Sequence, residues 1–248
     1  MAVIKTKYTQ FEFTQMIKLI KKFIPAWLLR WYRKRNMKIS KFQNMSTNEV
    51  FTEIYNNNLW KSSESISGTG SDISQTKSLI KDLDKLLTDM TITSVLDIPC
   101  GDFKWMQKVD LLKIDYIGAD IVDELIKSNI RQYKERGNFK FKVLNLITDP
   151  LPKSDIIIVR DCLVHLSYEN IYSAIKNIKS SGSKYLLATT FTNYHLNFDI
   201  VTGEWRPLNL QEKPFNFPSP ILVINENCTE DNGKYKDKSM ALWEISKI

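Results

Sequence analysis

The sequence predicts an α/β fold built on a doubly wound, mostly parallel seven-stranded sheet that finishes with an antiparallel strand pair. Two observations carry this prediction. Short apolar runs alternate with helix-like stretches up to residue 191, the pattern of parallel strands joined by crossover helices. The last two apolar runs, 221–224 and 240–245, are separated by a polar segment without a helical pattern, so they are expected to pair antiparallel.

The first predicted strand, 94–96, runs directly into the turn Asp97-Ile98-Pro99-Cys100-Gly101-Asp102. An apolar strand that ends in an acid and a glycine-bearing turn is typical of an open α/β sheet that receives an adenosyl ligand, because glycine lets the backbone approach the ligand closely. The three-glycine pattern of dinucleotide-binding turns is absent, which counts against NAD or FAD. The alternative is a tight strand-to-helix turn that binds nothing.

The second predicted strand, 116–120, ends in an acid 19 residues after Gly101. Adenosine-binding sheets place an acidic residue about 20 residues beyond the glycine turn, where it accepts hydrogen bonds from the ribose hydroxyls. Asp120 is therefore the predicted ribose ligand.

Three further strands follow. Residues 139–146 alternate apolar and polar side chains and carry Asn145 near their end, and the apolar run 155–159 leads into Arg160-Asp161. A fifth strand is expected at 185–191, after a helical stretch. Ahead of the glycine turn, apolar residues from Ile73 to Met90 recur at helical spacing, with Ser71 or Asp72 as the expected N-cap.

The N-terminal residues, 1–45, are predicted to form a basic, amphipathic helical extension that precedes a domain of residues 46–248. One apolar stripe recurs at helical spacing and comprises Phe13, Met16, Ile17, Ile20, Ile24, Trp27, Leu28 and Trp31. Pro25 is expected to kink the helix. Lysines interrupt the apolar run, so neither a signal peptide nor a membrane span is expected. The stripe either packs on protein, including a second copy, or lies on an anionic membrane surface.

Composition bounds the remaining possibilities. The chain has 248 residues, 43% of them hydrophobic, enough for one substantial core. Its three cysteines show no CxxC spacing or accompanying histidine cluster, so neither a zinc site nor a disulfide framework is expected, as is ordinary for a cytoplasmic protein. No recognised nucleic-acid-binding motif accompanies the net charge of +7.

The turn D-I-P-C-G-D resembles motif I of class I S-adenosylmethionine-dependent methyltransferases, whose usual form is D-x-G-x-G. Here Pro99 and Cys100 replace the first glycine. Together with R-D-x-x-x-H-L-S after the fourth strand and T-G-x-W-R-P-L-N-L with P-F-x-F-P further on, it is similar to a bacterial subgroup linked to sugar and surface-polysaccharide modification. The resemblance implies a Rossmann-like fold, with S-adenosyl-L-methionine as cofactor.

The resemblance also implies a set of cofactor-binding residues. Asn145 stands where such enzymes often hold the adenine amino group. The serine- and glycine-rich segment 62–71 either closes over the methionyl end of the cofactor with backbone N–H groups or is a flexible linker. The predicted cofactor residues are Asp97, Pro99, Gly101, Asp102, Asp120, Ile121, Asn145, Leu146 and Arg160, with Trp60, Gly68 and Ser71 from the segment before the turn.

His165 is the predicted catalytic base. It follows the fourth strand, at the edge of the sheet where ligands bind, and imidazole titrates near neutral pH. Asp161 lies four residues earlier and is expected to orient the ring or to act directly, while Ser167 is the expected N-cap of the next helix. The alternative is that His165 only packs at the start of that helix and Asp161 holds the cofactor or Arg160.

A long irregular insert, 192–220, is expected between the fifth strand and the final pair. Four of the eight prolines stiffen its second half, and its aromatic and polar side chains suit a polyhydroxylated ligand. Arg206 could instead pair with a phosphate. The alternative is a rigid loop over the sheet edge, with Trp205 and Phe217 in the core. The predicted substrate-binding residues are Tyr194, His195, Asn197, Asp199, Trp205, Arg206 and Asn209.

These inferences predict an S-adenosylmethionine-dependent O-methyltransferase that acts on a sugar hydroxyl during glycan or surface-polysaccharide assembly, without a metal and without a nucleic-acid partner. The alternatives are methylation of another small molecule or natural product, and a non-catalytic module targeted by its basic helix. A cytoplasmic location is expected. Residues 11–35 would supply contact with the inner face of the membrane or self-association.

Overall fold

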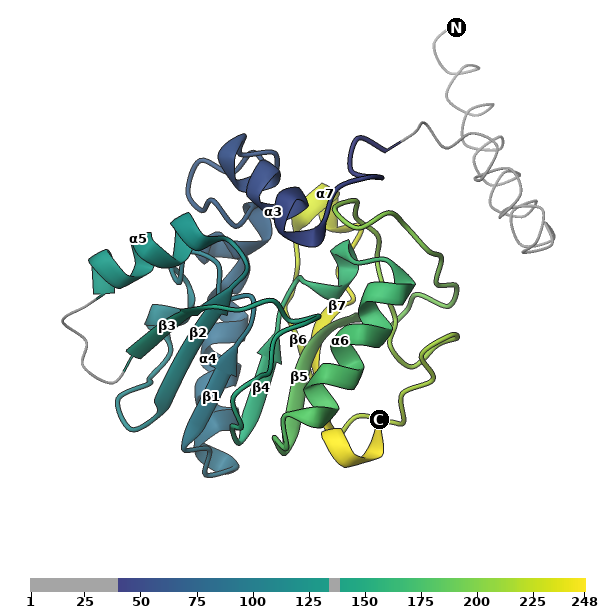
Figure 1. Ribbon diagram of the computed structural model, residues 1–248. Helices are drawn as coiled ribbons and strands as arrows, with labels where there is room; N and C mark the ends of the chain where they lie inside the picture. The colour runs from purple at the N-terminus through teal and green to yellow at the C-terminus, as the bar shows by residue number, and fades with distance from the viewer. Residues whose placement is uncertain (1–39, 134–138) are drawn as a thin grey trace, which may run out of the picture. The chain divides into compact units, whose positions relative to one another are not determined.

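The computed structural model describes residues 40–133 and 139–248. Seven strands form one sheet in the order β3-β2-β1-β4-β5-β7-β6. The first five pair in parallel, whereas β7 runs antiparallel to both β5 and β6. The doubly wound sheet and its C-terminal antiparallel pair confirm the predicted fold class (Figure 1).

The seven strands succeed one another in the order that the sequence pattern predicts. The strands are β1 (Ser94–Asp97), β2 (Asp115–Asp120), β3 (Phe139–Val143), β4 (Ile156–Val159), β5 (Tyr185–Phe191), β6 (Leu222–Asn225) and β7 (Lys238–Glu244). The α-helices are α3 (Thr47–Asn56), α4 (Ile73–Asp89), α5 (Asp123–Tyr133), α6 (Tyr168–Ser180) and α7 (Glu230–Gly233). Short 3-10 turns span Thr69–Ser71, Met106–Lys108, Leu163–His165 and Ile245–Lys247.

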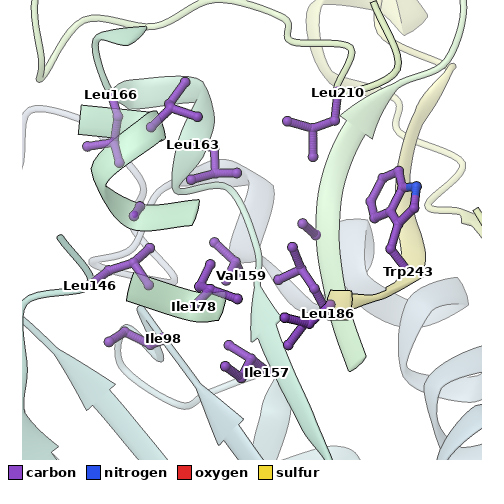
Figure 2. Close-up of a cluster of buried hydrophobic side chains, with 14 of the residues drawn as sticks. Ile98, Leu146, Ile157, Val159, Leu163, Leu166, Ile178, Leu186, Leu210 and Trp243 are labelled. Carbon is purple, nitrogen blue, oxygen red and sulfur yellow. The ribbon is translucent and has the colours of Figure 1, made fainter. Parts of the chain in front are cut away.

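Two apolar clusters, one on each face of the sheet, form the core. Leu96, Ile157 and Leu186 lie in the cluster that contains the buried face of α6. Their strand neighbours Val95 and Ile156 lie in the cluster that contains α4. Alternate residues of a strand point to opposite faces of the sheet. All four residues of β4 are apolar and buried, so this strand contributes side chains to both clusters. Figure 1 shows α6 and α4 on opposite faces, and Figure 2 shows the α6-side cluster.

Local signals account for two helix starts. Ser167 caps α6 by accepting a hydrogen bond from the Asn170 N–H at 3.3 Å, which confirms the expected N-cap. Asp72 is the N-cap residue of α4, but its side chain accepts the Ser62 hydroxyl at 2.8 Å instead of capping the helix.

Helix α3 was not predicted from the sequence, although its signal is present. Ser46 and Glu49 form a capping box, because each side chain accepts the other's backbone N–H. Phe42 packs with Val50 and Ile54 of this helix, and the compact unit begins at Lys41. The packed domain thus starts five residues before the predicted boundary at 46, because the buried Phe42 ring belongs to it.

The third strand is shorter than predicted. β3 ends at Val143, and Asn145 and Leu146 lie in the turn that follows. The Asn145 side chain accepts the Ile147 N–H at 2.9 Å, which stabilises a turn instead of a strand. The shorter strand leaves both residues at the carboxyl edge of the sheet.

Residues 192–220 contain neither a helix nor a strand, as expected for the insert. Buried polar side chains fix its path. Asn197 donates to the carbonyl of Asn209 at 2.7 Å, and Asn209 N–H donates back to the Asn197 amide at 2.9 Å. Phe217 packs edge-on against Trp243 at 5.3 Å, which confirms Phe217 as core, whereas Trp205 is 41% exposed.

Candidate active site

A cavity opens at the carboxyl edge of β1, β2 and β4. The turn after β1, the end of β2, the turn after β3 and the start of the segment after β4 all line it. Eight of the predicted cofactor residues, from Pro99 to Arg160, and two from the preceding segment meet here. They are Pro99, Gly101, Asp102, Asp120, Ile121, Asn145, Leu146 and Arg160, with Trp60 and Ser71, and the predicted base His165 lies beside them.

The glycine turn is built around Asp120. The two oxygens of its carboxylate accept the Gly101 N–H at 3.2 Å and the Val122 N–H at 3.0 Å. Burial raises the pKa of Asp120 to about 6, although these backbone N–H groups act to lower it. Gly101 has a φ of 55°, and a Cβ there would collide with the Ser67 hydroxyl, so both the turn and the neighbouring loop require glycine.

Asp97 lies behind this wall instead of on it. Its side chain is 1% exposed, does not line the cavity, and accepts the Tyr116 hydroxyl at 2.6 Å. Burial raises the pKa of Asp97 to about 7, opposed by the Tyr116 hydrogen bond and the charge of Arg160. The prediction of a direct cofactor contact is corrected: Asp97 supports the turn from inside the fold.

A testable consequence concerns stability and pH. Because the pKa of Asp97 is raised from 3.8 to about 7 in the folded protein, the folded state holds a proton that the unfolded chain releases. This group's contribution is complete below pH 4 and is lost as the pH rises toward 7. Asp97→Asn should therefore gain stability relative to wild type as the pH rises from about 4 to about 7, by at most about 1.4 kcal/mol per pH unit, and the difference should stay constant above pH 7. Urea unfolding at several pH values measures this, and a pH-independent difference would contradict it.

The serine-rich segment is a bonded cover, not a linker. Ser65 donates to the Asp102 carboxylate at 2.9 Å, and Asp102 N–H donates to Ser67 Oγ at 3.1 Å. Arg160 donates to the Gly70 carbonyl at 2.7 Å. The N–H groups of Ser67, Gly68 and Ser71 are engaged inside the segment, so they do not form the carboxylate cradle that was predicted. Gly68 lies away from this cavity, against Trp60.

Helix α3 contributes an aromatic wall that sequence reasoning missed. Thr47, Phe51 and Tyr55 recur every four residues on the face of α3 that lines the cavity. Phe51 lies 6.5 Å from the ring of Trp60, which lies 5.2 Å from the ring of His165. The four-residue spacing of these side chains was a signal that could have found them. Ser67, Trp105, Val122 and Cys162 also line the cavity without having been predicted.

His165 is held with one ring nitrogen fixed. Nδ1 lies 2.9 Å from the Glu204 carbonyl, which can only accept, so Nδ1 carries the proton and Nε2 keeps a lone pair. Burial lowers the pKa of His165 below 6.5, although the Glu204 carbonyl and Asp161 act to raise it. A neutral imidazole with a free Nε2 has the protonation state of a general base.

Asp161 does not orient that ring. Its carboxylate lies 2.6 Å from Lys238 Nζ and 3.4 Å from Arg160, and Arg160 also pairs with Glu226 at 2.6 Å. Although burial acts to raise it, the charges of Lys238 and Arg160 lower the pKa of Asp161 to about 2. So weak a base takes no proton at neutral pH. The carbonyl of Glu204, in the insert, does the orienting that was assigned to Asp161.

A second cavity adjoins the first. Four residues line both: Trp60, Ser67, Asp161 and His165. The far wall consists of the rings of Phe191, Trp205 and Tyr235 and of the start of α7, which Figure 1 shows at the same end of the sheet as α3. His165 therefore lies at the junction of two chambers.

Most predicted substrate residues lie elsewhere. Of the seven, Trp205 lines the second cavity, whereas Tyr194, His195, Asn197, Asp199, Arg206 and Asn209 line neither. Arg206 is fully buried and donates to the carbonyls of Leu163, Val164 and Leu166, so it anchors the insert and binds neither sugar nor phosphate. Asn197 and Asn209 are also buried and bond to backbone, because an irregular insert must satisfy its own polar groups.

The remaining three predicted substrate residues, His195, Asp199 and Tyr194, make contacts within the fold outside both cavities. His195 is exposed and pairs with Glu212 at 3.3 Å, and Asp199 accepts the Tyr168 N–H at 2.7 Å at the start of α6. Tyr194 packs against the α6-side core. His195 is thus not placed to replace His165 as base.

The predicted N-terminal helix, including residues 11–35, lies outside the described residues. Within residues 40–133 and 139–248, no helix combines the length and apolar character needed to cross a membrane. The same ranges hold no group of three or more His, Cys, Asp or Glu side chains arranged to bind a metal.

Comparison with known proteins places the fold. No protein-family model and no curated protein sequence matches the chain. Among solved structures it is similar to the N-methyltransferase NodS from Bradyrhizobium japonicum WM9 with S-adenosyl-L-homocysteine, with a TM-score of 0.56 and 12% identity over 80% of this chain and 98% of that one. Human N-acetylserotonin methyltransferase with S-adenosylmethionine gives a TM-score of 0.55 and 13% identity over 86% of this chain and 65% of that one. The methyltransferase domain of bacterial CtHen1 gives a TM-score of 0.51 and 13% identity over 70% of this chain and 98% of that one. The chain therefore has the Rossmann-like fold that these methyltransferases share.

Proposed function

We propose that this protein is an S-adenosylmethionine-dependent O-methyltransferase that acts on a sugar hydroxyl in glycan or surface-polysaccharide assembly. The observation that carries the proposal is the junction of two cavities at a neutral, oriented histidine. One cavity has the acidic residue and the glycine turn that an adenosyl group requires. The other offers aromatic and polar side chains of the kind that bind sugars.

The residues of the first cavity fit the cofactor. The Asp120 carboxylate would accept the ribose hydroxyls, and Asn145 would meet the adenine amino group beside the apolar side chains of Ile121 and Leu146. Arg160 has an Nε without a partner among the described residues, on a guanidinium that lines this cavity. Proteins of this fold have been solved with S-adenosylmethionine or S-adenosylhomocysteine bound. When bound, the cofactor supplies an activated methyl group.

The protein's own contribution is alignment, exclusion of water and removal of one proton. With the cofactor bound, the rings of Phe51, Tyr55 and Trp60 would limit the access of water to the first cavity beside the junction. The acceptor oxygen would lie at His165 Nε2, which takes the hydroxyl proton as the oxygen gains the methyl group. Glu204 then stabilises the imidazolium through its carbonyl, which still accepts from Nδ1.

Two measurements test this function together. Isothermal titration of the full chain with S-adenosylhomocysteine tests the cofactor site. A screen of nucleotide sugars, lipid-linked glycans and free sugars for radioactive methyl incorporation tests the acceptor class. Cofactor binding with transfer only to other small molecules would favour the natural-product alternative. Absence of cofactor binding would favour a non-catalytic module.

The Asp120 carboxylate gives a direct prediction for the cofactor site. Asp120→Ala should weaken S-adenosylhomocysteine binding by about 1.5–3 kcal/mol, the scale of hydrogen bonds to a charged group. Because the pKa of Asp120 is about 6, wild-type affinity should rise as the pH increases through 6, when the carboxylate ionises, and the variant should lose this dependence. Asp123→Ala, an exposed acid at the start of α5, is the matched control. Unchanged S-adenosylhomocysteine affinity in a folded Asp120→Ala variant would show that Asp120 is not the ribose ligand.

For the N-terminal extension, residues 1–45, we propose a separate role in contact with the inner face of the cytoplasmic membrane or in self-association through residues 11–35. Its support is the basic, tryptophan-bearing amphipathic pattern of the sequence. Vesicle sedimentation and light scattering of the full chain and a chain lacking residues 1–39 separate these two roles from each other and from catalysis.

A further inference from the structure

The side chains that line the second cavity indicate which chemical groups the sugar acceptor carries. The position of this cavity is defined by the wall it shares with the cofactor cavity, which includes Trp60 and His165. Because the proposed cofactor would occupy the first cavity, an acceptor whose oxygen reaches His165 would approach from this chamber. Its far walls therefore determine which acceptors are favoured.

Three aromatic rings form one of these walls. Trp205 and Tyr235 lie 4.9 Å apart at centroid, and Phe191 lies within 6.0 Å of each. The rings meet edge to face, and Trp205 is 41% exposed, so part of its surface is open to a ligand. Open aromatic faces attract both the apolar face of a sugar ring and a cation.

The charges around the chamber are unequal. Its lining holds three carboxylates, Asp161, Glu230 and Asp231, against a single cation, Lys238. Lys238 is buried and already paired, 2.6 Å from Asp161 and 3.6 Å from Glu226. With neutral His165 at the junction, none of the lining groups remains available to neutralise an anion.

Glu230 and Asp231 lie at the start of α7, after β6, whereas His165 follows β4. One Glu230 oxygen accepts the Thr69 hydroxyl at 2.5 Å, and Asp231 is paired at the surface with Lys234 at 3.2 Å. The second Glu230 oxygen accepts only the weak Cys228 Sγ–H donor at 3.6 Å, and a carboxylate oxygen can accept more than one hydrogen bond, so both carboxylates can still bind a cation. The carboxylate side of the chamber and the base side are thus contributed by different strand ends.

We propose that the chamber takes an amine-bearing sugar, with its protonated amino group against Glu230 and Asp231 and the hydroxyl to be methylated at His165. This inference rests on the proposed function. The ammonium has no lone pair with which to accept a methyl group. In the transfer, the bond from sulfur to methyl carbon breaks with both electrons remaining on sulfur, and the hydroxyl oxygen forms the new bond to carbon. The hydroxyl proton passes to His165 Nε2, and the sulfonium charge ends on the imidazolium.

A panel of matched acceptors tests the charge preference. The panel comprises 2-amino-2-deoxyhexoses of gluco, galacto and manno configuration, their N-acetyl forms, and the corresponding uronic acids. With the full chain and S-adenosylmethionine, kcat/KM should be about 10-fold or more higher for a free amine than for its N-acetyl form, the size of one charge-assisted contact. Equal or greater turnover of the N-acetyl form or the uronic acid, or a product methylated on nitrogen, would overturn the proposal.

Two variants locate the preference in the structure. Glu230→Gln keeps an acceptor for Thr69, and Asp231→Asn suits the left-handed backbone there, with φ of 50°. Each should lower kcat/KM for the amine by about 10-fold and leave the N-acetyl form unchanged. Glu169→Gln, an exposed acid in the first turn of α6, is the matched control and should behave as wild type. An equal loss for both acceptors would show that the carboxylates are structural and would overturn the assignment.

The two levels of the inference fail differently. If S-adenosylhomocysteine does not bind, the proposed function itself is wrong. If it binds and methyl transfer occurs to other acceptors but to no hexosamine, the function stands and the amine assignment is wrong.

Discussion

His165→Ala should lower kcat by about 10²–10⁴-fold, the contribution of a well-placed general base. The structure provides the reason. The Glu204 carbonyl holds Nδ1 as a donor at 2.9 Å, which leaves Nε2 as a proton acceptor at the junction of the two cavities. Alanine removes this acceptor but none of the predicted adenosyl contacts. S-adenosylhomocysteine affinity should therefore change little, and single-turnover methyl transfer measures the loss.

The pH profile separates a base from a packing residue. Burial lowers the pKa of His165 below 6.5. The wild-type rate should therefore fall as the pH drops through this lowered pKa, because the ring becomes protonated. This limb should be absent in His165→Ala. His195→Ala, at the exposed histidine outside both cavities, is the matched control and should keep both rate and limb. Near-normal turnover by His165→Ala would mean that the acceptor proton leaves by another route, and the placement of the acceptor would change with it.

Arg206→Met should destabilise the fold by about 3–5 kcal/mol, since buried carbonyls lose their donors. The guanidinium is fully buried and bonds to the carbonyls of Leu163, Val164 and Leu166, the turn that carries His165. Burial lowers its pKa only to about 10, so it stays charged at neutral pH. Methionine retains much of the volume of the side chain but none of its donors. The free energy of unfolding in urea measures the effect.

Arg131→Met, at an exposed arginine in the last turn of α5, is the control for loss of positive charge and should shift stability by less than about 0.5 kcal/mol. If Arg206 bound a substrate phosphate, as one interpretation of the sequence holds, its variant would keep wild-type stability and raise KM. A stable Arg206→Met protein with a raised KM would therefore restore the substrate role that the structure argues against.

The sequence by itself determined the fold class and much of the first cavity. Period-two and period-3.6 apolar patterns are local, so they placed the strands and the helices α4 and α6. The ends of successive parallel strands must meet at one edge, so Gly101, Asp120, Asn145 and His165 could be expected together before any contact was known. The proposed adenosyl site follows from this one-dimensional regularity.

Tertiary structure alone decided what the polar residues of the insert do and where the second cavity lies. Asparagine or arginine in an irregular segment can face a ligand or satisfy buried backbone, and only the burial of Asn197, Arg206 and Asn209 shows that here they satisfy backbone. Asp161 looked like a partner for His165 by spacing, but its charge is used by Lys238, 77 residues away. Such pairs join segments that are far apart in the chain. No local sequence pattern therefore identifies the partner of a given polar side chain.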